Sequence, residues 1–203
     1  MSELAVLQAV RLKGRADATV VAFSTGLVDE QASGLLTDLL ARGLVKGGPV
    51  VRLTPDGRAR LEDLLSQERH DVDAAGLETV YEDFHELNDT LKQVVTQWQM
   101  RTEDTPNDHT DAAYDVAVIN RLVADVDPPM RLLLDRMVAL APRLRPYGLR
   151  FARAVTQLQA GHAEYVARPI IDSYHTIWFE LHEELIGLLG RTRFDEALAG
   201  RAV

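Results

Sequence analysis

Apolar residues in the first part of the chain recur every three or four positions, as in amphipathic helices, and turns interrupt them. "ELAVLQAVRL" predicts a first helix that stops at "KGR", and "ADATVVAFSTGL" predicts a short second helix. "VDEQASGLLTDLLARGLVK" predicts a third helix that ends at Gly43, because glycine is favoured just after a helix. We therefore expect three helices before residue 44.

A hairpin and a fourth helix follow in the pattern. "LVKGGPVVRL" holds two short β-branched runs around Gly47 and Gly48, which predicts paired strands. In "LTPDGRARLEDLLSQ", Thr54 is a suitable N-cap and Pro55 suits the first helical position. The order of three helices, hairpin and helix is that of a winged helix-turn-helix. We expect such a domain at residues 1–70.

Beyond residue 70 the pattern is helical, without strand alternation. Polar or proline-containing segments such as "EDTPNDHTD", "DVDPP" and "APRLRPYG" divide it into about five helices. The first covers residues 74–100, and its heptad-like apolar stripe has one polar member, Asn88. The expected fold is mainly α, with an antiparallel α-helical bundle at residues 71–203.

The segment "DSYHTIWFELHEELIGLLGR" places two histidines among aromatic residues. On a helical wheel both histidines fall on the apolar arc, and Glu180, Glu183 and Glu184 fall on the opposite, solvated side. One interpretation is a core helix with hydrogen-bonded histidines, one of them paired with Asn88. The other is the wall of a small-molecule pocket. The pocket would be lined by Asn88, Trp98, His175, Trp178 and His182.

Motifs for catalysis, cofactors and metals are missing from the sequence. His175 and His182 lie about 10.5 Å apart along a helix, so a metal site would need His85, His109 or His162 as well. "HEELI" resembles a zinc-protease helix, but Ile186 replaces the second histidine. No GxxxxGK[ST], GxGxxG or GxSxG occurs. We expect a protein that is not an enzyme, with no catalytic residue, cofactor or metal ligand.

Composition and charge bear on where the protein is located and what it binds. The 203 residues are 46% hydrophobic and 26% charged, and no apolar run approaches the roughly 18 residues of a membrane span. The N-terminus lacks the residue order of a secretory signal, and there is no cysteine, so we expect a cytoplasmic protein that does not bind membranes. The net charge of −9 lies in residues 71–203, since residues 1–70 hold nine basic and nine acidic residues. A DNA contact would therefore involve the front of the chain.

"ATVVAFSTGLVDEQASGLLTDLLARGLV" followed by "LTPDGR" resembles the DNA-binding core of MarR-like regulators over the first third of the chain. The resemblance implies a homodimeric, ligand-responsive transcription regulator. It would bind DNA through the helix at residues 28–43 and the wing at 44–53. The candidate residues are Arg15, Arg52 and Arg58 for phosphates and Gln31, Ser33 and Thr37 for the groove. Glu30 and Asp38 on the same helix oppose DNA binding, so protein docking is the alternative.

"LNDTLKQVVTQWQ" and "DSYHTIWFELHEELIGLLGR" resemble a C-terminal segment of bacterial proteins related to pyruvate-phosphate dikinase. The phosphohistidine and nucleotide-binding parts of that enzyme have no counterpart here. This resemblance implies a non-catalytic interaction module for a phosphotransfer enzyme. The leading hypothesis remains a transcription regulator whose helical domain senses an unidentified small molecule.

Overall fold

The structure is a computed structural model that describes residues 2–192 and Glu196. The described chain is mainly helical, and its strands form one two-stranded sheet. It divides into two compact units. The first holds the residues up to Val72 together with Ile186–Arg191, and the second holds Asp73–Leu185 and the described residues after Arg191. The sequence places a boundary at residue 70 and gives no sign that 186–191 group with the first unit.

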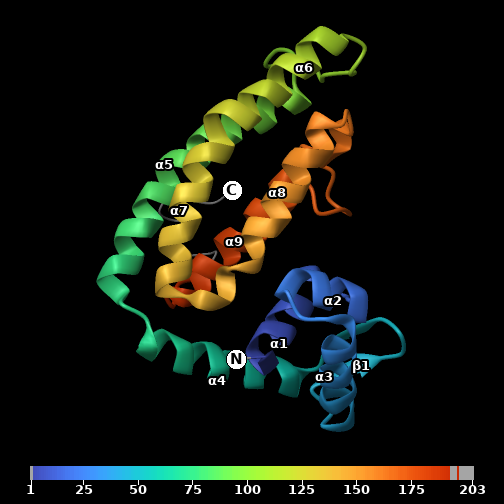
Figure 1. The fold of residues 1–203 in the computed structure, drawn as a ribbon, viewed down its shortest axis with the longest axis vertical. Coiled ribbons are helices and arrows are strands. Elements are labelled where there is room, and N and C mark those ends of the chain that lie inside the picture. The colour runs from blue at the N-terminus through green and yellow to red at the C-terminus, as the bar shows by residue number, and fades with distance from the viewer. Residues whose placement is uncertain (1, 193–195, 197–203) are drawn as a thin grey trace. The chain divides into compact units, whose positions relative to one another are not determined.

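The first unit has the element order expected from the sequence (Figure 1). Its elements are α1 (Ser2–Lys13), α2 (Ala18–Thr25), α3 (Asp29–Ala41), β1 (Val45–Gly47), β2 (Val51–Leu53) and α4 (Pro55–Asp71). Local capping explains the boundaries. The Asp17 carboxylate accepts a hydrogen bond from the Val20 amide, and the Thr54 hydroxyl accepts one from the Gly57 amide. Gly26 ends α2 with a φ of 71°, a conformation that glycine adopts without strain.

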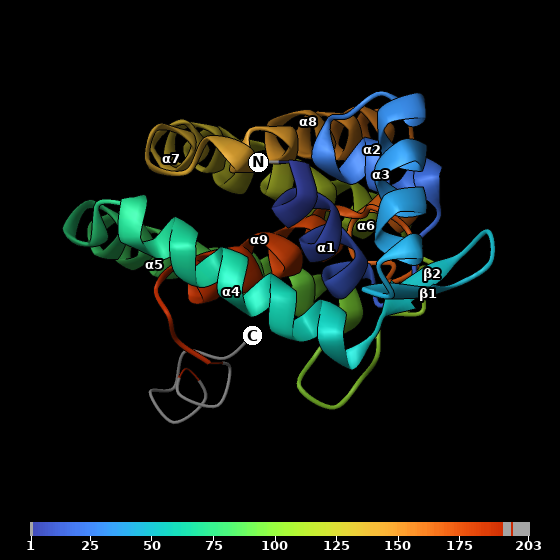
Figure 2. The same cartoon turned by 90° about the horizontal axis from the view of Figure 1, so that it is seen from below.

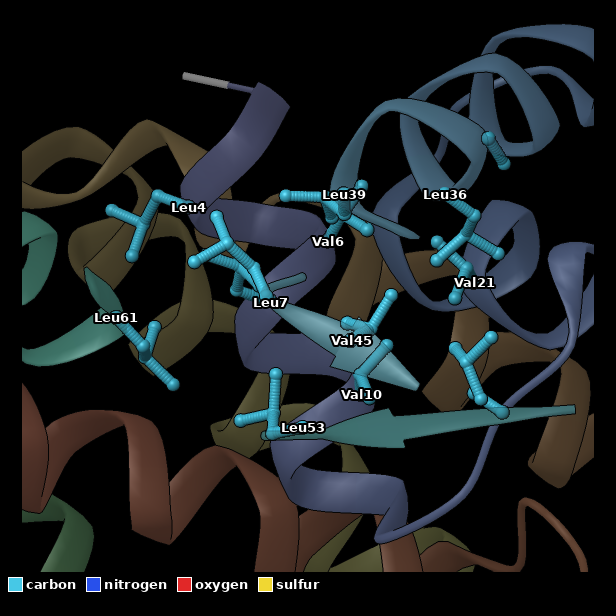
Figure 3. Packing of buried hydrophobic residues seen from close by; sticks show 14 of the residues in the cluster. Leu4, Val6, Leu7, Val10, Val21, Leu36, Leu39, Val45, Leu53 and Leu61 are labelled. Carbon is cyan, nitrogen blue, oxygen red and sulfur yellow. The ribbon is translucent and has the colours of Figure 1, made fainter. Parts of the chain in front are cut away.

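α1 supplies much of the core of the first unit. Its Val6, Leu7 and Val10 are fully buried and belong to one hydrophobic cluster with residues of α3 and both strands (Figure 3). β1 and β2 are antiparallel, with Val45 opposite Leu53. The loop that joins them is exposed and projects from the unit (Figure 2).

Close packing fixes the junction between the hairpin and α4. A Cβ atom at Gly57 would lie 1.9 Å from the Leu44 carbonyl oxygen, so only glycine fits there. The Thr54 hydroxyl also lies within hydrogen-bonding distance of the Gly43 and Leu44 carbonyl oxygens, at 2.7 and 3.0 Å. The start of α4 is therefore held against the beginning of β1.

The second unit is helical in its described part. Its main helices are α5 (Ala74–Gln99), α6 (Ala112–Arg121), α7 (Asp127–Leu140), α8 (Pro146–Gln159) and α9 (Tyr174–Leu188), the last of which extends three residues beyond the unit's limit at Leu185. Short 3-10 turns lie at Pro142–Leu144 and Ala163–Tyr165. No helix of the described chain combines the length and the hydropathy that crossing a membrane requires.

The predicted break at "DVDPP" is wrong. A π-helical segment, Leu122–Val126, joins α6 to α7, and the helix continues along α5 (Figure 1). The Asp127 amide donates to the Leu122 carbonyl, five residues earlier. Pro128 and Pro129 occupy the first turn of α7, where proline is tolerated. The prolines therefore change the helix type without ending the helix.

Side-chain contacts give the helix directions. Tyr81 contacts His182, and Asn88 contacts Trp178, so α5 and α9 run antiparallel. α8 and α9 also run antiparallel, because Tyr147 contacts Glu184 and Arg150 pairs with Glu180.

Candidate functional site

A basic concave surface lies on the first unit, and we call it the basic concavity. Its volume is about 420 Å³. The cationic side chains that line it are Arg11, Lys13, Arg15, Arg52 and Arg58, and the other lining residues are Val10, Gly14 and Leu53. No acidic residue is among them. The surface is thus suited to an anionic ligand.

A backbone bridge brings the basic residues together. Gly14, with a φ of 70°, turns the chain after α1. The Ala16 amide then donates to the Val51 carbonyl at 3.0 Å, and the Val51 amide donates back at 2.9 Å. Because this pairing is antiparallel, it sets the residue before Ala16 near the residue after Val51. Those residues are Arg15 and Arg52.

The three arginines predicted to contact phosphates, Arg15, Arg52 and Arg58, all line the basic concavity. Within the described chain, no carboxylate forms an ion pair with any of the three. Their charge is available to a ligand.

Other arginines of the first unit are engaged by acids. The Glu3 carboxylate accepts hydrogen bonds from Arg42 at 2.9 Å and Arg60 at 3.0 Å. These hydrogen bonds lower the pKa of Glu3, and the one from Arg60 has the largest effect. Arg42 also contacts Asp38 on α3 at 3.0 Å. Glu3 and Asp38 therefore neutralise arginines outside the basic concavity.

The predicted groove residues Gln31, Ser33 and Thr37 lie on the exposed surface of α3. They are not among the residues that line the basic concavity. The Thr37 hydroxyl donates to the Ser33 carbonyl at 2.9 Å. Glu30 and Asp38 are exposed on the same helix, so this surface is polar without being basic.

In the second unit, Asn88 and Trp178 are in direct contact. The Trp178 Nε1 atom donates to Asn88 Oδ1 at 2.9 Å, and the Phe84 ring stacks on Trp178 with centroids 4.8 Å apart. All three side chains are buried. A ligand between Asn88 and Trp178 would have to separate them. The expectation that Asn88 pairs with a histidine is wrong, since its oxygen bonds the indole.

His182 belongs to a different group of side chains, which we call the histidine cluster: Tyr81, His85, His182 and Glu196. The Tyr81 hydroxyl donates to Glu196 Oε2 at 2.6 Å and lies 3.0 Å from His182 Nε2. The donor and acceptor roles in the contact between Tyr81 and His182 depend on the tautomer of the imidazole. His85 Nε2 is 3.6 Å from Glu196 Oε2. The cluster joins α5, α9 and the chain beyond α9.

The remaining predicted pocket residues lie elsewhere. Trp98 is ten residues from Asn88, about 15 Å along α5, and its ring packs on His109 with centroids 4.4 Å apart. The Asn107 side chain donates to the Trp98 carbonyl. His175 is partly buried near the start of α9, and burial lowers its pKa. The five predicted residues are therefore spread along two helices, and a shared pocket stays a prediction.

The expectation that Glu180 and Glu184 are solvated is wrong. Arg150 Nη2 contacts Glu180 at 2.6 Å, Arg143 Nη1 contacts Glu184 at 2.6 Å, and both acids are buried. Conversely Phe179, an aromatic residue of the same helix, is 38% exposed. The cause is the chain packed against the acidic face of α9: Arg150 of α8 contacts Glu180, and Arg143 of the 3-10 turn before α8 contacts Glu184.

Arg150 holds this buried network together. It also forms two hydrogen bonds with Asp172, at 2.8 and 3.0 Å. Burial alone would lower its pKa, but the hydrogen bonds to Asp172 and the charge of Glu180 outweigh burial and raise the pKa. Sequence reasoning missed this network because its members are far apart along the chain.

The chain matches no known family model, and no curated protein or solved structure is significantly similar to it. Functional inference therefore rests on its own residues.

Proposed function

We propose that the first unit is a winged helix-turn-helix and that the protein is a DNA-binding transcription regulator. The observation that carries the proposal is the basic concavity, where five cations and no acid line one surface. Most protein–DNA contacts are made to phosphates, and these contacts orient the protein on the duplex. The element order of this unit and its resemblance to MarR-like regulators support the same function.

In this proposal the two polar surfaces of the first unit have different roles. Arg15, Arg52 and Arg58 hold phosphates, while Gln31, Ser33 and Thr37 reach toward the groove. Hydroxyl and amide side chains can bond base edges or phosphates. The second unit carries the small-molecule effector site and the contact between two copies.

Protein docking is the second candidate, and α3 supplies the observation that favours it. Glu30 and Asp38 are exposed there, and Arg42, which directly follows this helix, already contacts Glu3 and Asp38. A phosphate-lined groove repels such a surface. The resemblance to a segment of dikinase-related proteins would make the partner a phosphotransfer enzyme.

A binding experiment with matched variants separates the two candidates. Fluorescence anisotropy at low salt measures binding to a labelled duplex from upstream of the protein's own gene. An Arg52→Ala/Arg58→Ala variant should bind roughly tenfold more weakly, because charge-assisted phosphate bonds are lost. An Arg121→Ala/Arg136→Ala variant makes the same charge change in the second unit and should bind like the wild type.

Two outcomes would count against the proposal. If the wild type does not bind DNA, the docking function is favoured. If both double variants lose affinity equally, the basic concavity is not the DNA contact.

A further inference from the structure

We propose that His85, His182 and Glu196 form a binding site for a divalent transition-metal ion. Each side chain offers a ligand atom, and these three atoms lie within 4.8 Å of one another. No other group of three or more such residues with this proximity occurs within the described chain. This site is independent of the proposed DNA contact, which lies in the other unit.

The distances fit a metal centre after small side-chain rotations. Zinc binds imidazole nitrogen and carboxylate oxygen at roughly 2.0–2.2 Å, which places neighbouring tetrahedral ligands about 3.4 Å apart. His85 Nε2 and Glu196 Oε2 are already 3.6 Å apart. No two of the three ligand atoms are farther apart than 4.8 Å. A bound ion would require side-chain rotations that close the remaining gap.

The donor atoms select the class of metal. Two imidazoles and one carboxylate suit zinc, iron, cobalt or nickel, whereas calcium and magnesium prefer oxygen ligands alone. A set of three protein ligands leaves coordination positions open for water or a further ligand. The expected occupant is therefore a transition-metal ion such as Zn²⁺.

Tyr81 acts as a positioning residue for two of the ligands. Its hydroxyl is 2.6 Å from Glu196 Oε2 and 3.0 Å from His182 Nε2. Hydrogen bonds of this kind orient metal ligands and typically change metal affinity by about 10–100-fold. Tyr81 and His85 are four residues apart on α5, so both side chains lie on one face of that helix.

Burial is also consistent with a metal centre. Glu196 is 3% exposed and the His182 side chain 1%, and a bound cation would stabilise a carboxylate held so far from water. The His85 side chain is 18% exposed and is the most accessible of the three ligands. Surrounding aromatic rings, including Phe84 against His182, keep the ligands in place.

The test is metal titration of the full chain after treatment with EDTA and removal of the chelator. Zn²⁺ affinity is measured by competition with a chromophoric chelator, and Co²⁺ binding by its visible absorption. The wild type should bind one equivalent of each ion with a Co²⁺ spectrum typical of nitrogen and oxygen ligands. Circular dichroism confirms the fold of every variant.

Variants assign the ligands. His85→Ala changes the most exposed ligand and should weaken binding at least tenfold, as should Glu196→Gln. Tyr81→Phe should weaken binding and alter the Co²⁺ spectrum. His175→Ala is the matched control, since it removes a histidine of the same helix as His182 that lies outside the cluster, and it should bind like the wild type.

Three results would overturn the proposal. The first is a wild type that binds less than one equivalent of either ion at micromolar concentration. The second is a folded His85→Ala variant with unchanged affinity, and the third is an equal loss in His175→Ala. Loss of DNA binding alone would concern the proposed function and leave the metal site intact.

Discussion

At the scale of residues, buried polar side chains of the second unit have specific partners. Trp178 donates to Asn88, and His182 bonds Tyr81. The sequence identified these residues as inward-facing because helical periodicity is local. It could not assign the partners, because they depend on the register between α5 and α9. That register is set by packing between segments about ninety residues apart.

Asn88→Ala tests the assigned partner of Trp178. The change removes the acceptor of a buried indole N–H and leaves a cavity, so we expect a loss of about 1–3 kcal/mol in the free energy of unfolding. Urea unfolding measures it. Asn120→Ala, at an exposed position of α6, is the control and should change stability by less than about 0.5 kcal/mol. Equal effects would mean that the contact contributes nothing.

The burial of His175 predicts how the stability of the protein depends on pH. Burial lowers its pKa in the folded state, so the unfolded chain binds this proton more readily. The contribution of neutral His175 to the free energy of unfolding is complete above the pKa of the unfolded chain, about 6.5. It decreases as the pH falls from there through the lower pKa of the folded state. His175→Gln should therefore lose less stability than the wild type between pH 7.5 and 5.5, measured by urea unfolding. A greater loss would show the opposite pKa shift.

At the scale of elements, local chemistry made the first unit predictable. The Thr54 cap and Gly43 after α3 are readable in the sequence, and both adopt the expected conformation. Elements of the second unit depend on distant contacts. The buried Glu180 looks solvated on a helical wheel because the wheel cannot include Arg150 of α8. The basic concavity also depends on a contact between distant segments. Arg15 and Arg52 were predicted individually from the sequence, but the Ala16–Val51 bridge that brings them together was not.

Arg150→Ala tests the contact between α8 and α9. Removing the guanidinium takes away the cation that pairs with buried acids, above all Glu180. We therefore expect the free energy of unfolding to fall by about 3–5 kcal/mol. Arg153→Ala, at an exposed position of the same helix, is the control and should cost less than about 0.5 kcal/mol. Thermal and urea unfolding measure both. A loss below about 1 kcal/mol in Arg150→Ala, the value of a surface ion pair, would contradict the buried network.

At the scale of the whole molecule, the net charge does not show where the charged residues lie. Residues 1–70 have equal numbers of acids and bases, and the chain as a whole carries −9. In space, Glu3 neutralises Arg42 and Arg60, while the cations of the basic concavity line a surface without acids. A protein with a net negative charge can therefore present a local surface that attracts phosphate.

Exposed apolar residues of the second unit lead us to expect a homodimer. Leu132 of α7 is strongly exposed and lines a concave surface with Leu87 and Pro129. A two-fold dimer would cover such residues and pair two DNA-binding units. Light scattering at micromolar concentration should give twice 22.6 kDa for the wild type and a lower mass for Leu132→Asp. A wild-type mass of 22.6 kDa would contradict the dimer.

The salt dependence of DNA binding tests the central claim most directly. Each phosphate that the protein neutralises contributes a slope of about −0.9 to the plot of log affinity against log salt concentration. If three to five cations of the basic concavity contact phosphates, the wild type should give a slope of about −3 to −5. Arg52→Ala/Arg58→Ala should reduce its magnitude by about 2. A wild-type slope near zero, or no DNA binding at low salt, would contradict the account.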